Sequence, residues 1–333
     1  MDATTEAIDG SVTEMLWDTI IVGGGAAGLS AGVELARAQF ATSVVDGGAP
    51  RNGPADHMHG YLTRDGMAPG EFVATGHAEP ARYVGRLVRA SATDARHAPN
   101  GTFGLQLDDD RALRARSVPV AAGLADELPG IPGRSERWAS EVHRRPHCHG
   151  HEVRGRTIVV IGRAMGAVSK HLAALMRRYN SGTTFCRNGI QISAAERQRL
   201  LAYGVRLIDA AVTRVVTSAD TAGGNPVAIE LANGETVGCS ALFVAPRPVP
   251  RDAILTTLRA AEAPVSGLVA VDSQGATSCP GGWAAGNVVN PRAQVVAAAG
   301  AGSTAAISMT GRLLAQELSA AVSGDLLDVG GVN

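Results

Sequence analysis

The glycine-rich turn at residues 23–28 constrains the fold of this chain more than any other feature. It follows an apolar run at residues 19–22, and Gly23, Gly25 and Gly28 fit the spacing G-x-G-x-x-G. The first glycine of this pattern allows a tight turn, and the second lets the backbone approach a diphosphate. The third lets the following helix pack on the strand. The segment therefore predicts a buried strand, a ligand-binding turn and a helix.

An acidic residue follows the turn at the distance that a dinucleotide site requires. The helical pattern over about residues 27–38 leads to a second apolar run at residues 42–45, which ends in Asp46. An acidic residue there accepts hydrogen bonds from a ribose, and the helix start at Ala26 and Ala27 faces the diphosphate. We predict a dinucleotide-binding βαβ unit. The alternative is a glycine turn in an unrelated α/β protein.

The same pattern recurs in the middle of the chain. A strand is predicted at residues 157–161, a turn at 162–166, a helix at 167–179 and a second strand at 182–185. Two copies of a strand–turn–helix–strand unit indicate an α/β protein with two Rossmann-like three-layer (ββα) domains.

Strand-rich and linker-like segments set the predicted domain limits. We expect strands within residues 87–120, a hairpin over 213–237, a strand at 241–245, linkers at 128–133 and 246–250, and a long helix ending the segment 286–318. These segments predict a flexible tail at residues 1–15, a discontinuous first domain at 16–122 and 247–333, and a second domain at 126–245.

Composition narrows the class of protein. Of the 333 residues 45% are hydrophobic and 18% charged, and the formal net charge is −1. This balance predicts a globular core and argues against a nucleic-acid partner bound through a basic face. We expect neither a signal peptide nor a membrane span. Four scattered cysteines argue against a disulfide scaffold and favour the cytoplasm.

Further motifs occur in a fixed order along most of the chain. They are residues 23–28, Asp46 with 47–52, 57–61, 64–66, 123–129, Trp138, Pro146 with 148–150, 280–288, and Gln294 with Val295. In this order they resemble the thioredoxin reductase-like FAD-dependent oxidoreductases. They are similar in particular to the bacterial and fungal branch that oxidises dithiols in specialised metabolites such as holomycin and gliotoxin.

The resemblance implies an FAD site and a homodimer. Gly286, Asn287 and Val288 would lie at the ribityl chain and phosphate, and the helix start at Gln294 and Val295 would lie at the pyrimidine side of the flavin. A helix N-terminus there would stabilise negative charge on reduced flavin. The full predicted set is Gly23, Gly25, Ala26, Ala27, Gly28, Asp46, Gly47, Arg51, Asn52, His59, Gly286, Asn287, Gln294 and Val295.

The redox motif of the family departs from its usual form here. By the resemblance Arg145 stands where the first cysteine of C-x-x-C would be, Cys148 is the second cysteine, and His149 holds the acid/base position. A single cysteine cannot cycle as a dithiol–disulfide pair, so we do not expect thioredoxin reduction. Cys148 is then a reactive thiolate favoured by Arg144, Arg145 and His149, a centre cycling through sulfenic acid, or a relic.

The residue types at this motif allow two further interpretations. Arg145 could hold an acidic or carbonyl group of a small substrate. The histidines around Cys148 match no standard zinc spacing, so we expect no metal site.

The second glycine turn is eroded. It keeps Gly162, but Arg163 and Ala164 follow, and only Arg187 remains of the basic cluster that NADPH-dependent relatives use for the 2′-phosphate. Either NAD(P)H binds weakly or this domain is structural. The pattern favours an oxidase or dehydrogenase that acts on a small metabolite, a thiol among the options, with O2 reoxidising FAD. The alternatives are an NAD(P)H-dependent reductase or peroxidase using Cys148, and a non-catalytic flavoprotein.

Overall fold

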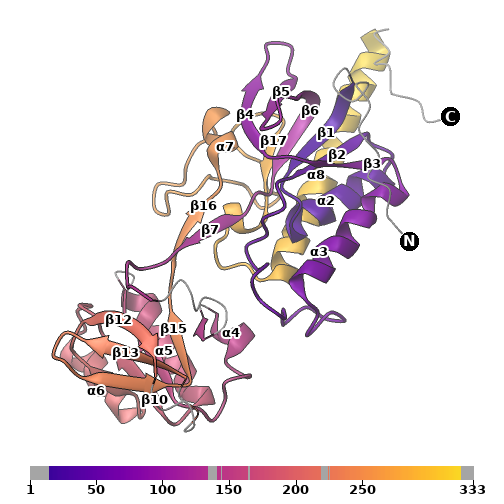
Figure 1. Ribbon diagram of the computed structural model, residues 1–333. Coiled ribbons are helices and arrows are strands. Elements are labelled where there is room, and N and C mark those ends of the chain that lie inside the picture. The colour runs from indigo at the N-terminus through magenta and orange to yellow at the C-terminus, as the bar shows by residue number, and fades with distance from the viewer. Residues whose placement is uncertain are drawn as a thin grey trace. The chain divides into compact units, whose positions relative to one another are not determined.

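The computed structural model describes residues 15–133, 141–143, 145–163, 166–218, 224 and 226–323. Within them the chain forms two compact units (Figure 1). Residues 15–56, 60–125 and 249–323 form the first, and the described parts of 57–59 and 126–248 form the second. The predicted tail lies outside the described residues except for its last residue, and Trp138, Arg144 and Ala164 lie outside them too. Which cofactor each predicted domain holds stays a prediction.

The first unit is built on a seven-stranded sheet in the order β3-β2-β1-β6-β5-β4, with β17 paired to β6. Strands β1, β2, β3, β6 and β17 run parallel, whereas β4 and β5 form an antiparallel ribbon on β6. The strands are β1 Leu16–Val22, β2 Thr42–Asp46, β3 Gly85–Arg89, β4 Ala92–His97, β5 Phe103–Leu107, β6 Ala112–Val120 and β17 Gly282–Ala284.

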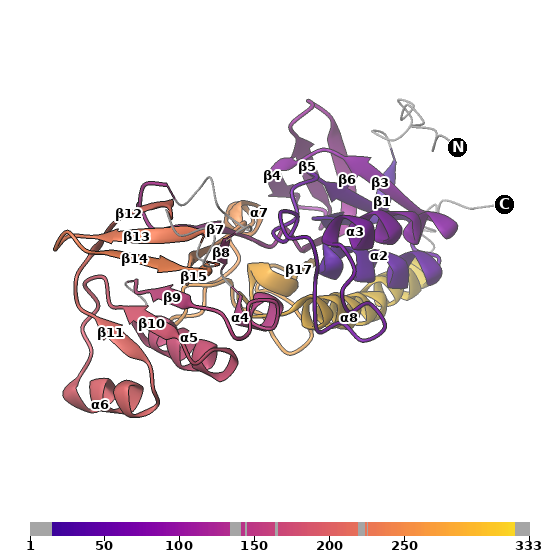
Figure 2. The same cartoon turned by 60° about the horizontal axis from the view of Figure 1, so that its bottom comes forward.

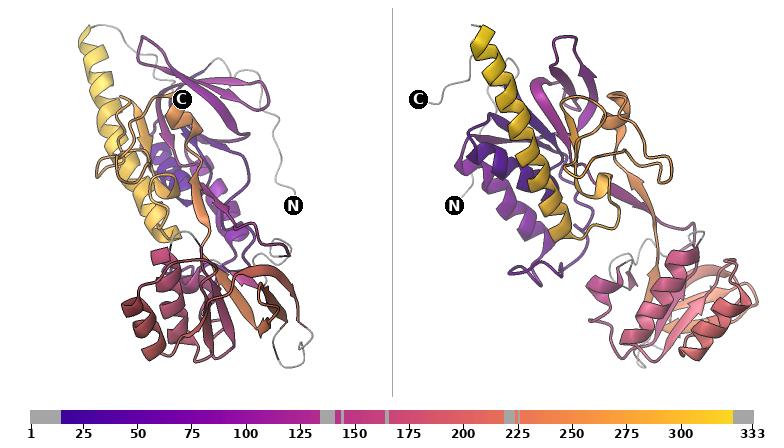
Figure 3. Two further views of the ribbon diagram at one scale, coloured as in Figure 1. Left: turned by 90° about the vertical axis from the view of Figure 1, so that its left-hand side faces the viewer. Right: turned by 180° about the vertical axis from the view of Figure 1, so that it is seen from behind.

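Both faces of the parallel strands are buried, which explains why β1 is a continuous apolar run rather than an alternating one. Ile20 and Val45 belong to one core cluster, while Ile21 and Val44 belong to another that α2 and α8 cover. Figure 3 shows the long helix α8 alongside α2. The helical segments are α2 Ala26–Arg37, α3 Pro69–Ala78, η1 Pro80–Arg82, α7 Ala253–Thr257, η3 Gly286–Val288 and α8 Val295–Ser323.

The second unit repeats the three-layer plan at smaller size (Figure 2). A parallel sheet in the order β11-β10-β9-β15-β8 is accompanied by a three-stranded antiparallel meander, β12-β13-β14. The elements are β8 Val142–His143, α4 Pro146–His149, β9 Ile158–Ile161, α5 Gly166–Tyr179, β10 Thr183–Cys186, α6 Ala194–Ala202, β11 Arg206–Ile208, β12 Val212–Thr217, β13 Val227–Leu231, β14 Thr236–Cys239 and β15 Ala241–Val244.

These elements confirm the predicted fold class and both strand–turn–helix–strand units. Two predictions need correction. The segment 213–237 holds parts of three strands rather than one hairpin, because β14 adds to the other edge of β13. The predicted linker at 246–250 contains strand β16 Arg247–Pro250, which pairs with β7 Leu124–Glu127. In a two-stranded pair alternate residues point their N–H groups to the same side, so two prolines spaced by two are tolerated there.

One further observation concerns membranes. Among the described residues there is no helix of the length and hydrophobicity that a bilayer span requires.

Candidate functional site

In the first glycine turn, backbone atoms leave no room for a side chain at Gly23 and Gly28. Gly23 has a φ of +113°, and a Cβ there would lie 2.5 Å from the carbonyl oxygen of Ala121 on the neighbouring chain segment. A Cβ on Gly28 would overlap the carbonyl oxygen of Gly23. The turn and the close packing of α2 on β1 therefore both depend on the absence of side chains.

Gly25 differs from these two because a Cβ there would meet nothing within 4 Å. It is the N-cap of α2 in extended conformation, and no described side chain caps the helix. The first N–H groups of α2 have no carbonyl partner within the helix. The start of α2 at Ala26 and Ala27 is therefore uncapped, and Gly25 leaves the space in front of it open. Such a helix start fits a diphosphate.

Asp46 ends β2, and both of its carboxylate oxygens have partners in the protein. Its Oδ1 accepts a hydrogen bond from the Gly48 N–H at 3.1 Å, and its Oδ2 lies 2.9 Å from Nε2 of His77. The His77 hydrogen bond is the main reason why the pKa of the Asp46 carboxyl is lowered, against the opposing effect of burial. The carboxylate is thus kept ionised. Sequence reasoning missed His77, which stands 31 residues away.

Arg51 and Asn287, both predicted to contact FAD, meet across 236 residues of sequence. Arg51 Nη1 donates to Asn287 Oδ1 and to the Pro291 carbonyl, each at 3.2 Å. Burial lowers the pKa of Arg51 to about 10. Asn287 Nδ2 in turn donates to the carbonyls of Asn290 and Ala293, each at 3.0 Å. Asn287 therefore shapes the loop that leads into α8.

The C-terminal segment lies on the start of α2. Gly286 has a φ of +76°, and a Cβ there would lie 2.9 Å from the Ala27 Cβ. A Cβ on Gly302 would overlap the Ala27 backbone. Gln294 accepts the first backbone bond of α8 from Ala298 at 2.8 Å, and Val295 is the first helical residue.

Three other predicted contact residues lie apart from this segment. Gly47 packs against Ser91, whose Oγ would lie 2.7 Å from an added Cβ. Asn52 closes a turn by accepting from the Ala55 N–H at 3.0 Å. His59 is grouped with the second unit, where its Nε2 lies 3.6 Å from Glu152 Oε1.

Cys148 lies on the single turn of α4 in the second unit. Pro146 opens this turn, and the N–H groups of Cys148 and His149 donate to the Arg145 carbonyl at 3.2 Å and 3.1 Å. The structure thus places all three predicted catalytic residues on one short segment. None of the four cysteines forms a disulfide, and Cys148 is half-buried whereas the other three are buried. Cys186 instead donates to the Ala210 carbonyl at 3.1 Å.

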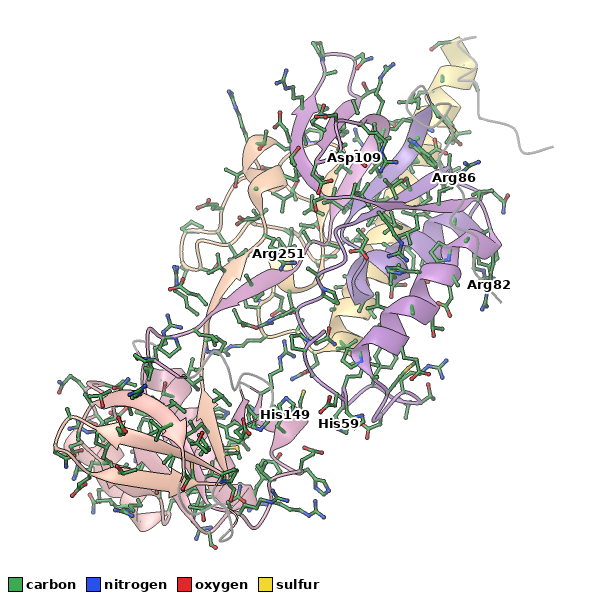
Figure 4. All side chains as sticks on the ribbon, viewed as in Figure 1. His59, Arg82, Arg86, Asp109, His149 and Arg251 are labelled. Carbon is green, nitrogen blue, oxygen red and sulfur yellow. The ribbon has the colours of Figure 1, made fainter. Side chains whose placement is uncertain are left out.

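His143 is a further residue of this segment that sequence reasoning gave no role beyond crowding Cys148. Its ring stacks on His149 with centroids 4.5 Å apart, and Phe243 lies 5.4 Å away on a tilt (His149 is labelled in Figure 4). Desolvation, with a smaller contribution from His149, lowers the pKa of His143 to about 4. His143 is therefore neutral at physiological pH. No group of three potential ligands that could hold a metal occurs among the described residues.

The second glycine turn is held by contacts within the protein. A Cβ on Gly162 would overlap the Arg187 carbonyl, so this glycine is structural. Arg163 donates to the Glu127 carbonyl and lies 3.5 Å from the Glu127 carboxylate. Arg187 donates to Asp209 at 2.6 Å. Both arginines of the predicted nicotinamide site are therefore engaged by carboxylates of the same unit.

Comparison with known proteins assigns the family. Residues 17–302 match the pyridine nucleotide-disulphide oxidoreductase family. The chain belongs to this family. It is an FAD-dependent oxidoreductase of the thioredoxin reductase-like type, and its glycine turn, Asp46 and the open start of α2 fit FAD. Bound FAD would supply two-electron redox chemistry.

Among curated proteins, the chain is similar to the thioredoxin reductase aclD of Aspergillus oryzae, with 30% identity over 247 residues, which are 71% of this chain and 76% of that protein. It is 29% identical to the thioredoxin reductase tcpT of Claviceps purpurea over 68% of this chain and 72% of that protein.

Among solved structures, HlmI superposes with a TM-score of 0.87 at 39% identity, covering 93% of this chain and 96% of HlmI. An oxidoreductase from Agrobacterium tumefaciens gives a TM-score of 0.81 at 32% identity, covering 91% of this chain and 100% of the other. This member of the pyridine nucleotide-disulphide oxidoreductase family thus has full-length structural relatives.

Proposed function

We propose that this flavoenzyme is an oxidase or dehydrogenase that takes electrons from a small specialised metabolite and is reoxidised by O2. A thiol is the first substrate class to test, since the chain resembles the dithiol-oxidising branch of the family. The observation that carries the proposal is the motif at the start of α4, where Arg145 replaces one of the two redox cysteines and Cys148 forms no disulfide. Dithiol–disulfide exchange with a protein partner needs both sulfurs.

The contacts of the second glycine turn support an electron donor other than NAD(P)H. A 2′-phosphate would have to compete with Asp209 for Arg187, and with Glu127 for Arg163. Breaking a carboxylate–guanidinium pair to bind a ligand reduces the net gain in affinity. The alternative, an NAD(P)H-dependent reductase or peroxidase that uses Cys148, requires these pairs to open.

Arg145 at the N-cap of α4 and Cys148 and His149 within α4 would have separate roles in the reaction. Bound FAD would supply the two-electron redox chemistry, with O2 as the final electron acceptor, reduced to hydrogen peroxide. His149 accepts a proton from the substrate, because imidazole is a base near neutral pH. Arg145 orients an acidic or carbonyl group of the substrate. Cys148 contributes a polarisable thiol or thiolate beside them.

Anaerobic mixing with NADPH, and separately with NADH, tests the proposal directly. We expect the oxidised-flavin absorption band to persist with both nucleotides and to disappear with dithionite. Small thiols are then screened for flavin bleaching without oxygen and for peroxide formation with it. Rapid bleaching by either nucleotide would overturn the proposal in favour of a reductase or peroxidase.

We also propose that the enzyme is a homodimer in the cytoplasm. The outward face of α8 supports an interface, because its exposed positions carry no charge and include Ile307 and Leu318, which are 62% and 70% exposed. Four cysteines without a disulfide fit a reducing compartment. Sedimentation of the wild type and of Leu318→Glu tests the dimer: a monomeric wild type would contradict it.

A further inference from the structure

The carboxylate of Asp46 lies directly beneath the first glycine turn. A Cβ on Gly24 would overlap the Asp46 side chain, so the turn admits the carboxylate only because residue 24 is glycine. The Gly48 N–H donates to the carboxylate at 3.1 Å and His77 Nε2 lies 2.9 Å from it, and the nearby Gly24 N–H also helps to lower the pKa of Asp46. A carboxylate has about four acceptor positions, so it can still receive a ribose hydroxyl.

α3 packs against α2 just before His77. At Gly76 an added Cβ would lie 2.8 Å from Cδ1 of Leu29 on α2. The next residue, His77, is then brought to the end of β2. The side chains of His77 and Asp46 are both 12% exposed, so solvent competes little for their hydrogen bond.

The contact also determines which side chain donates the hydrogen bond and which accepts it. Asp46 can only accept when ionised, so His77 must carry a proton on Nε2 to donate to it. A hydrogen bond to a charged acceptor is stronger than one between neutral groups. The carboxylate is therefore both held in place and kept in the acceptor state that a ribose hydroxyl requires.

We propose that His77 is a positioning residue for the flavin cofactor, holding Asp46 for the hydroxyls of the adenosine ribose of FAD. This inference rests on the proposed role of Asp46 in FAD binding. It concerns affinity for the cofactor and is independent of which substrate the enzyme oxidises. His77 does not contact FAD in this scheme and acts through Asp46 alone.

A double-mutant cycle on cofactor affinity tests the inference. The deflavinated proteins are titrated with FAD and binding is followed by flavin fluorescence. For His77→Ala we expect Kd to increase, by up to about ten- to a hundred-fold, which is the most that one ribose hydrogen bond to the Asp46 carboxylate can contribute. In the Asp46→Asn background the same substitution should change Kd by less than about three-fold. His77→Gln, which keeps an N–H donor, should recover part of the loss.

Two further measurements separate positioning from a general loosening of α3. Thr75→Ala, at an exposed position of the same helix, should leave the Kd unchanged. An FAD analogue with 2′-deoxyadenosine should bind the wild type more weakly than FAD, whereas His77→Ala should discriminate less between the two. Packing alone would weaken both cofactors equally.

The outcomes distinguish the two levels of the proposal. If Asp46→Asn leaves FAD affinity unchanged, the proposed role of Asp46 fails. If Asp46→Asn weakens binding but His77→Ala does not, or if the His77 effect persists in the Asp46→Asn background, the inference about His77 is wrong. Should His77→Ala fail to fold, His77→Gln and the deoxy analogue in the Asp46→Asn protein decide the question.

Discussion

The imidazole of His143 stacks on that of His149 with ring centroids 4.5 Å apart and an interplanar angle of 26°. His143 comes from the edge strand β8, whereas His149 comes from α4, so strand and helix meet through two titratable rings. His143 Nδ1 is buried and finds no hydrogen-bond partner among the described residues. If both rings carried a positive charge, two like charges would lie within van der Waals distance of each other. Burial makes this arrangement costly.

The pair predicts acid sensitivity of folding. The pKa of His143 falls from an ordinary value of 6.5 to about 4 in the folded protein. As pH drops through about 6.5 the unfolded chain takes up a proton that the folded protein refuses until about pH 4, so folding stability should fall across this window. We expect about 2 kcal/mol less stability from His143 at pH 5 than at pH 7.5.

Denaturant titrations at the two pH values measure this loss. His143→Phe keeps an aromatic ring against His149 and Phe243 but cannot titrate, so the pH dependence should shrink by that amount. His97→Phe replaces an exposed histidine of the first unit and serves as the control. An unchanged pH dependence in His143→Phe would show that the buried ring is not the acid-sensitive group.

Thiol reactivity should single out Cys148. Cys186 and Cys239 are fully buried, and burial raises their pKa values to about 11 and about 12, while Cys279 is 8% exposed with a raised pKa. Thiolates are the reactive species, so all three should be inert in the native state. An aromatic disulfide reagent should release one equivalent of chromophore from the native protein and four after denaturation.

The Cys148→Ser variant provides the check on that count. It should release no chromophore in the native state and three equivalents after denaturation. Two reactive thiols in the native wild type would mean that one of the buried cysteines becomes accessible. That cysteine would then be a candidate redox partner for Cys148.

Local pattern in the sequence was enough to predict the sheets and the glycine turns. Residues 19–22 are apolar without alternation because β1 is buried on both faces, and the spacing of Gly23, Gly25 and Gly28 follows from backbone contacts within a few residues. Constraints of this kind involve residues that are close together in the sequence, so they can be recognised there. The predicted family is confirmed by the match over residues 17–302.

Contacts that depend on packing left no such trace. His77 meets Asp46 because α3 packs against α2, and Arg187 meets Asp209 because β10 and β11 are neighbours. A histidine or aspartate that completes a distant ion pair looks like any other polar residue in sequence. The engagement of both nicotinamide-site arginines was therefore visible only in three dimensions.

Replacement by alanine should change the stability of the protein in opposite directions at two glycines of α8. An alanine methyl at residue 302 would overlap the Ala27 backbone and push α8 away from α2. We expect Gly302→Ala to destabilise the protein by about 1–3 kcal/mol and to weaken FAD retention. At Gly300 a methyl meets nothing within 4 Å, so Gly300→Ala should stabilise the helix by about 0.5–1 kcal/mol.

Thermal melts with flavin fluorescence as a second signal separate the two variants. Loss of stability in Gly302→Ala without earlier flavin release would show that α8 can shift without disturbing the cofactor. Equal melting temperatures for both variants would contradict the close α2–α8 contact itself.

Removal of the buried Arg116 side chain should cost more folding stability than removal of an exposed ion-pair residue. Arg116 is 7% exposed. Its guanidinium donates to Asp18 at 2.7 Å, to Glu317 at 2.9 Å and to the Leu313 carbonyl at 3.0 Å, and so joins β6 and β1 to α8. Arg116→Met leaves two carboxylates without their cation, and we expect a loss of about 3–5 kcal/mol in the free energy of unfolding.

Arg111 supplies the matched control because its partner Asp109 is exposed (labelled in Figure 4). Arg111→Met should cost less than about 1 kcal/mol, since water screens an exposed pair. Denaturant titrations of the two variants and the wild type measure both losses. Equal losses in Arg116→Met and Arg111→Met would mean that burial of Arg116 adds nothing to the stabilisation by its ion pairs.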